Sequence, residues 1–204
     1  MGHPSHSSEK ARMFNNPVLD KLSKTHISIP ITILTGAGIG LIIYGLYHGL
    51  TTVLEVSLLF VIGFIVFTLA EYLMHRYLYH IEPSTESRKK LQYTIHGMHH
   101  DYPNDKERLA MPPIVSAFLA VVVFSIFYLI MGTYAYGFTA GFYVGYSSYL
   151  FVHYSVHAFT PPKNFLKELW IHHSLHHYKD QEKGFGVSSP LWDFVFGTLP
   201  TRKK

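Results

Sequence analysis

LAMPPIVSAFLAVVVFSIFYLIMGTYAYGFTAGFYVGYSSYLFVHYSVHAFTPP, residues 109–162, is the stretch that decides the fold, because its 54 residues include no Asp, Glu, Lys or Arg. A helix that crosses a membrane needs about 20 predominantly apolar residues. The stretch therefore predicts two membrane spans, at roughly 113–131 and 134–152, that turn at MGTYAYG. Pro112 and Pro113 suit the start of the first of these helices.

Two more apolar tracts precede this stretch. Residues 27–54, ISIPITILTGAGIGLIIYGLYHGLTTVL, contain no charged residue. Residues 56–70, which are also uncharged, lie between Glu55 and Glu71. These tracts predict spans at roughly 29–48 and 52–74, joined by a tight turn near Gly49. The alternative, a soluble helical bundle, requires polar faces at helical period, which the tracts lack. We therefore expect an all-α integral membrane protein with four transmembrane helices, in which residues 1–204 form a single domain.

The composition supports a membrane protein and limits its chemistry. Hydrophobic residues make up 48% of the chain and charged residues 15%, whereas soluble domains carry about 25% charged residues. The chain has no cysteine, which excludes disulfides, thiolate-bound zinc, iron–sulfur clusters and haem-thiolate chemistry.

The basic residues predict the orientation in the membrane. All 17 Lys and Arg lie in the N-terminal segment, in 76–110 and in 155–204, which four spans place on one side. The positive-inside rule makes that side cytoplasmic, together with both termini. Topology and anionic lipids thus explain the net charge of +4, and we expect no nucleic-acid partner.

Histidine is the compositional outlier, and ten of the 15 histidines fall into spaced motifs. Two motifs follow the second and fourth predicted spans, and the others lie in the segments 75–110 and 153–204, which we expect to form a helical cap on the cytoplasmic side. The ten are His75 and His80 in HRYLYH, His96, His99 and His100 in HGMHH, His153 and His157 in HYSVH, and His173, His176 and His177 in IHHSLHHY.

The spacings of these histidines suit metal binding. Residues three and four apart share one face of a helix, so His96, His99 and His100 can converge on one point, and the motif at 173–177 repeats that spacing. His75 and His80 are five residues apart, about 140° around a regular α-helix. For that pair we expect either that the helix ends or that the two rings serve two metals.

Ten nitrogen ligands exceed the coordination number of one ion, so we predict two metals with about five imidazoles each. Iron, zinc, copper and nickel all suit imidazole. Ligating rings need a hydrogen-bond acceptor for their other N–H. Glu71 and Asp101 are candidates for that role, or else ordinary interfacial charges. His172 lies one turn before His176, so helix geometry alone does not exclude it as a ligand; the repeated spacing favours a role beside the ligands.

In this order, HRYLYH, HGMHHDYP, HYSVH and HSLHHYK resemble the motifs of the fatty acid hydroxylase/sterol desaturase superfamily of membrane di-metal oxygenases. NNPVLDKLSK and GFGVSSPLWDFVFGT resemble its fatty acid 2-hydroxylase branch, and the resemblance extends from about Asn15 to Thr198. It implies that the ten histidines named above are the metal ligands and that no further catalytic residue is required. Two departures are Ala158, where the family commonly has a second histidine after the one matched by His157, and the lack of room for a haem-binding electron-transfer domain.

The resemblance implies dioxygen-dependent, di-iron hydroxylation of a lipid acyl chain at the carbon next to the carbonyl. The substrate is then a fatty acid, ceramide or other acyl lipid within the membrane, and electrons come from a separate donor protein. Zinc binds an all-nitrogen site more tightly than ferrous iron does, so a purified sample can hold zinc.

Two other functions stay open. One is a sister membrane oxidase, such as a desaturase or a sterol or carotenoid hydroxylase. The other is a non-enzymatic metal-binding membrane protein, although a transporter would have its ligands at mid-membrane. For the location we favour a bacterial inner membrane over the endoplasmic reticulum membrane.

Overall fold

The fold is that of a computed structural model, which describes residues 12–201. This part of the chain contains helices and no strand, which confirms the all-α class. The α-helices are α1 (Pro17–Leu22), α2 (Ser28–Tyr47), α3 (Val53–Met74), α4 (Glu86–Gln92), α5 (Met98–Asp101), α6 (Pro113–Met131), α7 (Ala135–Ala158), α8 (Lys167–Tyr178) and α9 (Leu191–Val195). The π turns η1 (His75–Tyr79) and η2 (Tyr93–Gly97) and the 3-10 turns η3 (Lys106–Arg108) and η4 (Gly132–Tyr134) lie between them.

Helices α2, α3, α6 and α7 lie where the sequence predicts the four spans. Three helical segments are long and apolar enough to cross a membrane, namely Ser28–Tyr47, Val53–Tyr79 and Lys106–Ala158. There are three instead of the expected four because the last segment contains both α6 and α7. Its turn is at Gly132, whose φ of 59° suits glycine. Helix α7 runs six residues beyond the expected end of its span at 152. Residues 153–160 contain neither glycine nor proline, and the first helix-breaking residue after the span is Pro161.

The turn between α2 and α3 has clear local causes. Gly49 adopts a φ of 63°, a conformation that favours glycine. Thr52 and Glu55 then form a capping box: the Glu55 N–H donates to the Thr52 hydroxyl over 3.3 Å, and the Thr52 N–H donates to the Glu55 carboxylate over 2.7 Å. The chain therefore reverses within a few residues, and α3 starts at a fixed point.

Helices α3 and α7 cross in close contact because glycines lie between them. A Cβ at Gly141 would be 1.9 Å from the Phe60 carbonyl oxygen, and one at Gly63 would be 2.0 Å from the Phe138 carbonyl oxygen. Gly137, Gly141 and Gly145 repeat at every fourth position of α7, the small-residue spacing that lets membrane helices approach closely. This contact fixes the relative position of the two helices that lead into the histidine motifs.

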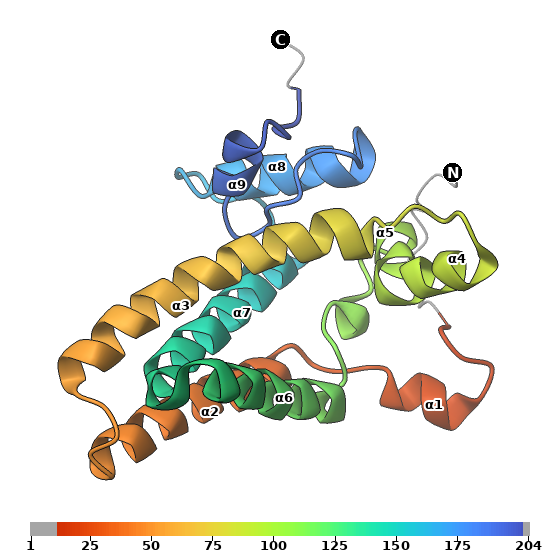
Figure 1. Cartoon of the computed structure of the whole chain (residues 1–204). Coiled ribbons are helices and arrows are strands. Elements are labelled where there is room, and N and C mark those ends of the chain that lie inside the picture. Colours follow the sequence, from red (N-terminus) through yellow and green to blue (C-terminus); the bar gives the residue numbers. More distant parts are fainter. Residues whose placement is uncertain (1–11, 202–204) are drawn as a thin grey trace.

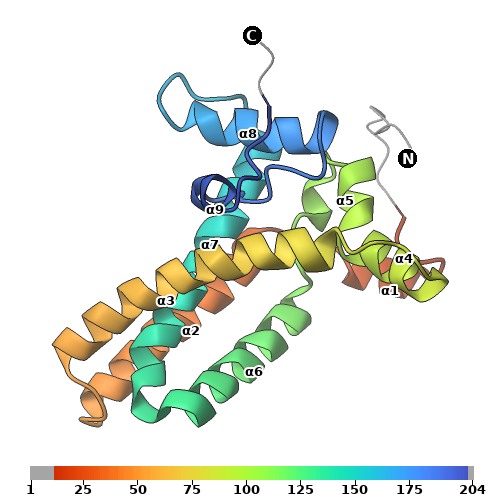
Figure 2. The ribbon, with the colours of Figure 1, turned by 45° about the horizontal axis from the view of Figure 1, so that its top comes forward.

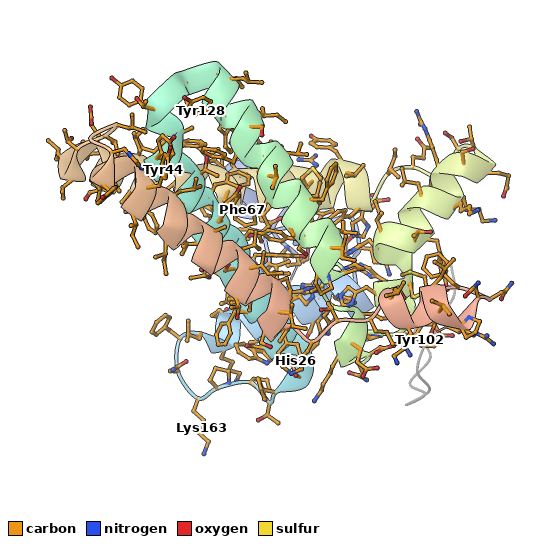
Figure 3. All side chains as sticks on the ribbon, turned by 90° about the horizontal axis from the view of Figure 1, so that it is seen from below. His26, Tyr44, Phe67, Tyr102, Tyr128 and Lys163 are labelled. Carbon is orange, nitrogen blue, oxygen red and sulfur yellow. The ribbon has the colours of Figure 1, made fainter. Side chains whose placement is uncertain are left out.

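The short elements gather at one end of the long helices. Figure 1 shows the α2–α3 and α6–α7 turns at one end and α4, α5, α8 and α9 at or above the other. Figure 2 shows α6 and α7 as the two arms of a hairpin. Phe67 lies among the long helices in Figure 3, whereas Lys163, on the connection between α7 and α8, extends away from them. Apolar side chains such as Leu129 and Ile114 are 84% and 78% exposed on the outside, as contact with lipid would require.

Candidate metal centre

The structure brings all ten predicted histidines together at the end of the long helices, in two groups of five. The first histidine group consists of His75, His80, His96, His100 and His176; the second consists of His99, His153, His157, His173 and His177. Within each group, one ring nitrogen of every histidine lies within 4.8 Å of those of the others. Eight of the ten residues are buried, and His80 and His157 are half-buried. The described residues thus contain two clusters of converging imidazole nitrogens, which matches the predicted number of metals.

Each three-histidine motif is divided between the two groups. His96 and His100, four residues apart, belong to the first group, while His99 belongs to the second. The expectation that these three rings converge on one point is therefore wrong, because the motif lies between the two groups and presents rings to both. The second motif shows the reverse division, with His173 and His177 in the second group and His176 in the first.

The pair His75 and His80 is aligned by a π turn. The His80 N–H donates to the His75 carbonyl oxygen over 3.2 Å, the hydrogen bond between residues five apart that defines this turn. Regular α-helix ends at Met74, as one of the two expectations required, but both rings then join the first group. The other expectation, that the pair serves two metals, is wrong, because the wider turn cancels the angle that a regular helix would put between the rings.

The contacts inside each group match those of ligands around an ion. Two nitrogens that each lie about 2.1 Å from one metal at a right angle are about 3 Å apart. Nε2–Nε2 distances in the first group are 3.0 Å for His75–His96, 2.9 Å for His96–His100 and 3.1 Å for His80–His176. In the second group they are 2.9 Å for His99–His153 and 2.8 Å for His157–His173. The donor set and its spacing therefore fit a transition-metal ion in each group.

The two groups are neighbours. The rings of His100 and His177, one from each group, stack with centroids 4.2 Å apart and planes 18° apart. Adjacent residues in the motifs, His99–His100 and His176–His177, have ring centroids 5.9 and 5.7 Å apart. Two ions bound in these groups would lie close enough to act on one molecule.

Burial keeps the imidazole rings of the histidines that lie outside the long helices in their uncharged form. It lowers the pKa of His80 to about 4, and, with neighbouring histidines, it lowers the pKa of His176 to about 3 and that of His100 to about 2. Burial and neighbouring rings also hold the pKa of His96, His99, His173 and His177 well below the usual value. At neutral pH these imidazoles therefore offer a lone pair, as metal binding requires.

Two rings of the first group are oriented by backbone carbonyls. His75 Nδ1 donates to the Phe185 carbonyl oxygen over 2.6 Å, and His176 Nδ1 donates to the Lys183 carbonyl oxygen over 2.8 Å. With the proton on Nδ1, Nε2 keeps its lone pair and points into the group. Sequence reasoning missed these acceptors, because a backbone carbonyl leaves no mark in the sequence.

The carboxylates that we considered as acceptors have other roles. Glu71 accepts hydrogen bonds from the N–H groups of Val187 and Ser188, over 2.7 and 2.8 Å. Asp101 is half-buried and does not hold its neighbours, since Nδ1 of His99 and of His100 has no hydrogen-bond partner in the described part of the chain. Glu71 thus acts on the segment that orients His75, one step from the ring itself.

An apolar cavity of about 330 Å³ leads to the first group between α3, α6 and α7. Its wall includes Phe67 and Ala70 of α3, Ala120 of α6 and Phe142 of α7, and it reaches His75. The wall of the cavity is therefore mainly hydrocarbon and aromatic rings, and a predicted metal ligand forms part of it.

Comparison with known proteins gives consistent results. The sequence model of the fatty acid hydroxylase family matches residues 60–198. A dihydroceramide fatty acyl 2-hydroxylase of Arabidopsis thaliana is 37% identical, over 72% of this chain and 62% of its own length. The human fatty acid 2-hydroxylase is 34% identical, over 94% of this chain and 57% of its own length. The solved structure of full-length scs7p, in which only the hydroxylase domain is visible, superposes with a TM-score of 0.81 at 32% identity, covering 97% of this chain and 77% of that one.

This chain spans less than two thirds of the length of these curated relatives, 62% of the plant protein and 57% of the human one. The similarity therefore covers one portion of those proteins, the portion that contains the histidine motifs.

Proposed function

The chain belongs to the fatty acid hydroxylase family, and on this premise we propose that it hydroxylates a lipid acyl chain at the carbon next to the carbonyl. The observation that carries this proposal is the apolar cavity whose wall includes His75. Cavities that bind ligands are mostly apolar with a few polar groups at the reacting end. An acyl chain matches that description, with an apolar tail for the cavity and a polar head for the capping helices.

We assign the ten histidines of the two groups as ligands of two iron ions. When bound, the two ions would supply the activation of dioxygen and the oxidation of a C–H bond, with electrons from a separate donor protein. The chain itself supplies neutral nitrogen ligands at fixed positions and a cavity that excludes water. A sample purified with zinc would be inactive without contradicting this assignment, because zinc binds nitrogen sites more tightly than ferrous iron does.

The residues of the cavity would place the substrate. An extended acyl chain in the cavity would contact Phe67 of α3, Ala120 of α6 and Phe142 of α7, so apolar side chains rather than water would surround its methylene groups. His75 stands at the end of the cavity nearest the histidine groups, so the carbon to be oxidised is brought there by the position of the tail. No side-chain acid or base is needed for this placement.

For the membrane arrangement we propose four spans, with α6 and α7 crossing separately and the capping helices on the cytoplasmic side. The two chain ends, which we also expect to be cytoplasmic, lie outside the described residues. The relatives reported above come from a plant and an animal. They give no support to the bacterial inner membrane that the sequence led us to favour.

The substrate class that we propose is supported by the names of the relatives, a dihydroceramide fatty acyl 2-hydroxylase and a fatty acid 2-hydroxylase. We propose a fatty acyl chain, free or carried by a ceramide. A sister oxidase acting on sterol or carotenoid rings is the second candidate, because it would use a metal site of the same kind. The names of the relatives favour the first candidate.

The test is mass spectrometry of total fatty acids in a host that lacks 2-hydroxy acids. Cells that express the chain should accumulate 2-hydroxy fatty acids, and fragmentation should place the hydroxyl on carbon 2. His99→Ala should abolish the product, while His48→Ala, which changes a histidine outside both groups, should not. New oxidised sterols or carotenoids without hydroxy acids would refute the proposal. Protein that binds metal yet consumes no oxygen with iron and a reductant would favour a non-enzymatic role.

A further inference from the structure

We propose that Asp193 and His172 are positioning residues for the first histidine group alone. They hold the segment 183–188, and that segment orients two of the metal ligands through its carbonyl oxygens. The inference rests on the metal-binding part of the proposed function. It gives the two groups different supports although their ligands are of one kind.

Asp193 is the centre of this arrangement. It is 0% exposed, and an unpaired charge at such a position would be very costly. Four donors surround it. One carboxylate oxygen accepts from the Phe185 N–H over 2.9 Å and from the Thr198 hydroxyl over 2.7 Å. The other accepts from the Gly186 N–H over 2.7 Å and from His172 Nε2 over 3.0 Å. Burial raises the pKa of Asp193, but these donors, His172 first, bring it below the usual value.

The backbone of the segment 183–188 is shaped for this contact. Gly184 adopts a φ of 76°, which favours glycine. A Cβ at Gly186 would lie 2.2 Å from the Ser189 carbonyl oxygen and 3.0 Å from the Asp193 carboxylate, so a larger residue would push the N–H away from its acceptor. On its far side the segment is attached to Glu71 of α3 through Val187 and Ser188. Two buried carboxylates therefore hold residues 185–188 of the segment.

From this segment the orientation passes directly to two ligands. The Phe185 N–H donates to Asp193, and the carbonyl of the same residue accepts from His75. The Lys183 carbonyl, one residue before Gly184, accepts from His176. A change at Asp193 therefore reaches both rings through one rigid peptide segment. Acceptors of this kind raise the affinity of the ligand for its metal.

In the described residues no hydrogen bond joins the segment 183–188 to the second group, whose His153 has its backbone contact with Leu109 instead. Nδ1 of His99, His173 and His177 is buried without a hydrogen-bond partner there. Loss of the Asp193 contacts should therefore weaken metal binding in the first group and leave the second unaffected. This selectivity separates a positioning role from a general loss of folding.

His172 has its own part in this arrangement. The ring is 4% exposed and lies outside both groups of converging nitrogens. Its Nε2 donates to a carboxylate and therefore carries the proton, which leaves that atom no lone pair for a metal. His172, the first histidine of IHHSLHHY, thus donates a hydrogen bond to Asp193 and fixes the direction of its carboxylate.

The experiment uses the full chain, purified in detergent, stripped of metal and titrated with Zn²⁺ as the probe. Bound zinc is measured by mass spectrometry, and the melting temperature is recorded for each variant. Asp193→Asn keeps the shape but replaces an acceptor by a donor facing N–H groups. We expect it to weaken zinc binding in the first group by about 10- to 100-fold. His172→Leu should do the same, and His172→Gln, which can still donate, should restore part of the affinity.

Double variants assign the loss to one group. With the second group disabled by His157→Ala, adding Asp193→Asn should remove the remaining high-affinity zinc. With the first group disabled by His80→Ala, adding Asp193→Asn should change nothing further. Equal weakening in both backgrounds, or unchanged affinity in both, would overturn the inference.

The proposed function can fail separately. Wild-type protein that binds two zinc ions but never forms 2-hydroxy acids with iron would refute the hydroxylase and leave the positioning role intact. An active wild type whose Asp193→Asn variant binds both zinc ions normally would refute only the positioning role.

Discussion

The two histidine groups are built from the same parts but surrounded differently. Each group takes a pair from the end of a long helix or the turn that follows it, a pair four residues apart from one three-histidine motif, and a single ring from the other motif. Only the first group has a member, His75, in the wall of the apolar cavity, and only its rings are bound by the segment 183–188. Identical ligands therefore need not give identical metal sites, because the neighbours of the rings differ.

This difference indicates a division of roles. A substrate in the cavity would meet the first group, two of whose rings are held by hydrogen bonds to the segment 183–188, whereas no ring of the second group lines the cavity. Tyr149 connects the two regions, since it lines the cavity and stacks on His153 with ring centroids 5.4 Å apart. Four experiments test how far the comparison holds.

The largest effect should come from removing one ligand of either group. His100→Ala and His177→Ala change neighbouring, stacked rings of the first and the second group. Loss of a hydrogen-bond partner of a metal ligand lowers metal affinity or activity by about 10- to 100-fold. Loss of a ligand itself should therefore reduce 2-hydroxy acid formation by at least about 100-fold in both variants. His26→Ala serves as the control. If either variant kept a tenth of the activity, its group would be dispensable.

Blocking the cavity should lower the catalytic efficiency for the substrate without changing metal binding in either group. Ala70→Leu enlarges a side chain in the cavity wall. Overpacking costs about 1–3 kcal/mol, which predicts a kcat/KM lower by about 10- to 100-fold. Bound metal should be unchanged. Val121→Leu, on the exposed side of α6 (66% exposed), is the matched control. A normal kcat/KM for Ala70→Leu would show that the substrate does not bind in this cavity beside the first group.

Zinc affinity should differ between the groups in the wild-type protein. Rings with a fixed Nδ1–H bind metal more tightly, so titration of the metal-free chain should have two phases about 10-fold apart in affinity. His80→Gln should remove the tighter phase and His157→Gln the weaker one. A single phase, or the reverse assignment, would show that the carbonyl contacts do not decide affinity.

Acid should destabilise the metal-free protein modestly, through both groups. The pKa of His176 in the folded protein is about 3, below about 6.5 for an unfolded chain. Between these values the unfolded chain binds more protons, so stability is present above pH 6.5 and is lost as the pH falls below it. The melting temperature should drop by about 4 °C or more from pH 7.5 to 5. His176→Gln and His177→Gln should each reduce this drop; a higher melting temperature at pH 5 would contradict the sign.

The sequence was sufficient to predict which ten histidines come together and which tracts form long helices, but not how the ten are divided between the two groups. Charge-free runs and spacings of three and four residues are local patterns with a direct physical meaning. The glycine repeat at 137, 141 and 145 is of the same kind and could have predicted the close contact of α3 and α7. We did not use it.

Other features depended on contacts between distant segments. His96, His99 and His100 share a helical face, so nothing local indicates that the middle ring belongs to another group. In the sequence, Asp193 is a single charged residue among aromatic ones and carries no motif. Its four hydrogen-bond donors come from three segments that the fold brings together. The π turn was missed because a regular helix was assumed.

That π turn has a consequence for insertions and deletions. Every paired ligand on a helix spans one hydrogen-bonded turn, with three intervening residues in the α-helical pair His153–His157 and four across the π turn of His75–His80. Loss of one residue from 76–79 would leave a pair that an ordinary α-helix aligns, so the chain can absorb it by tightening the turn. The same loss between His153 and His157 would rotate one ring by about 100° out of its group. The HRYLYH motif is thus the place where the length of the chain can change by one residue while both ligands keep their direction.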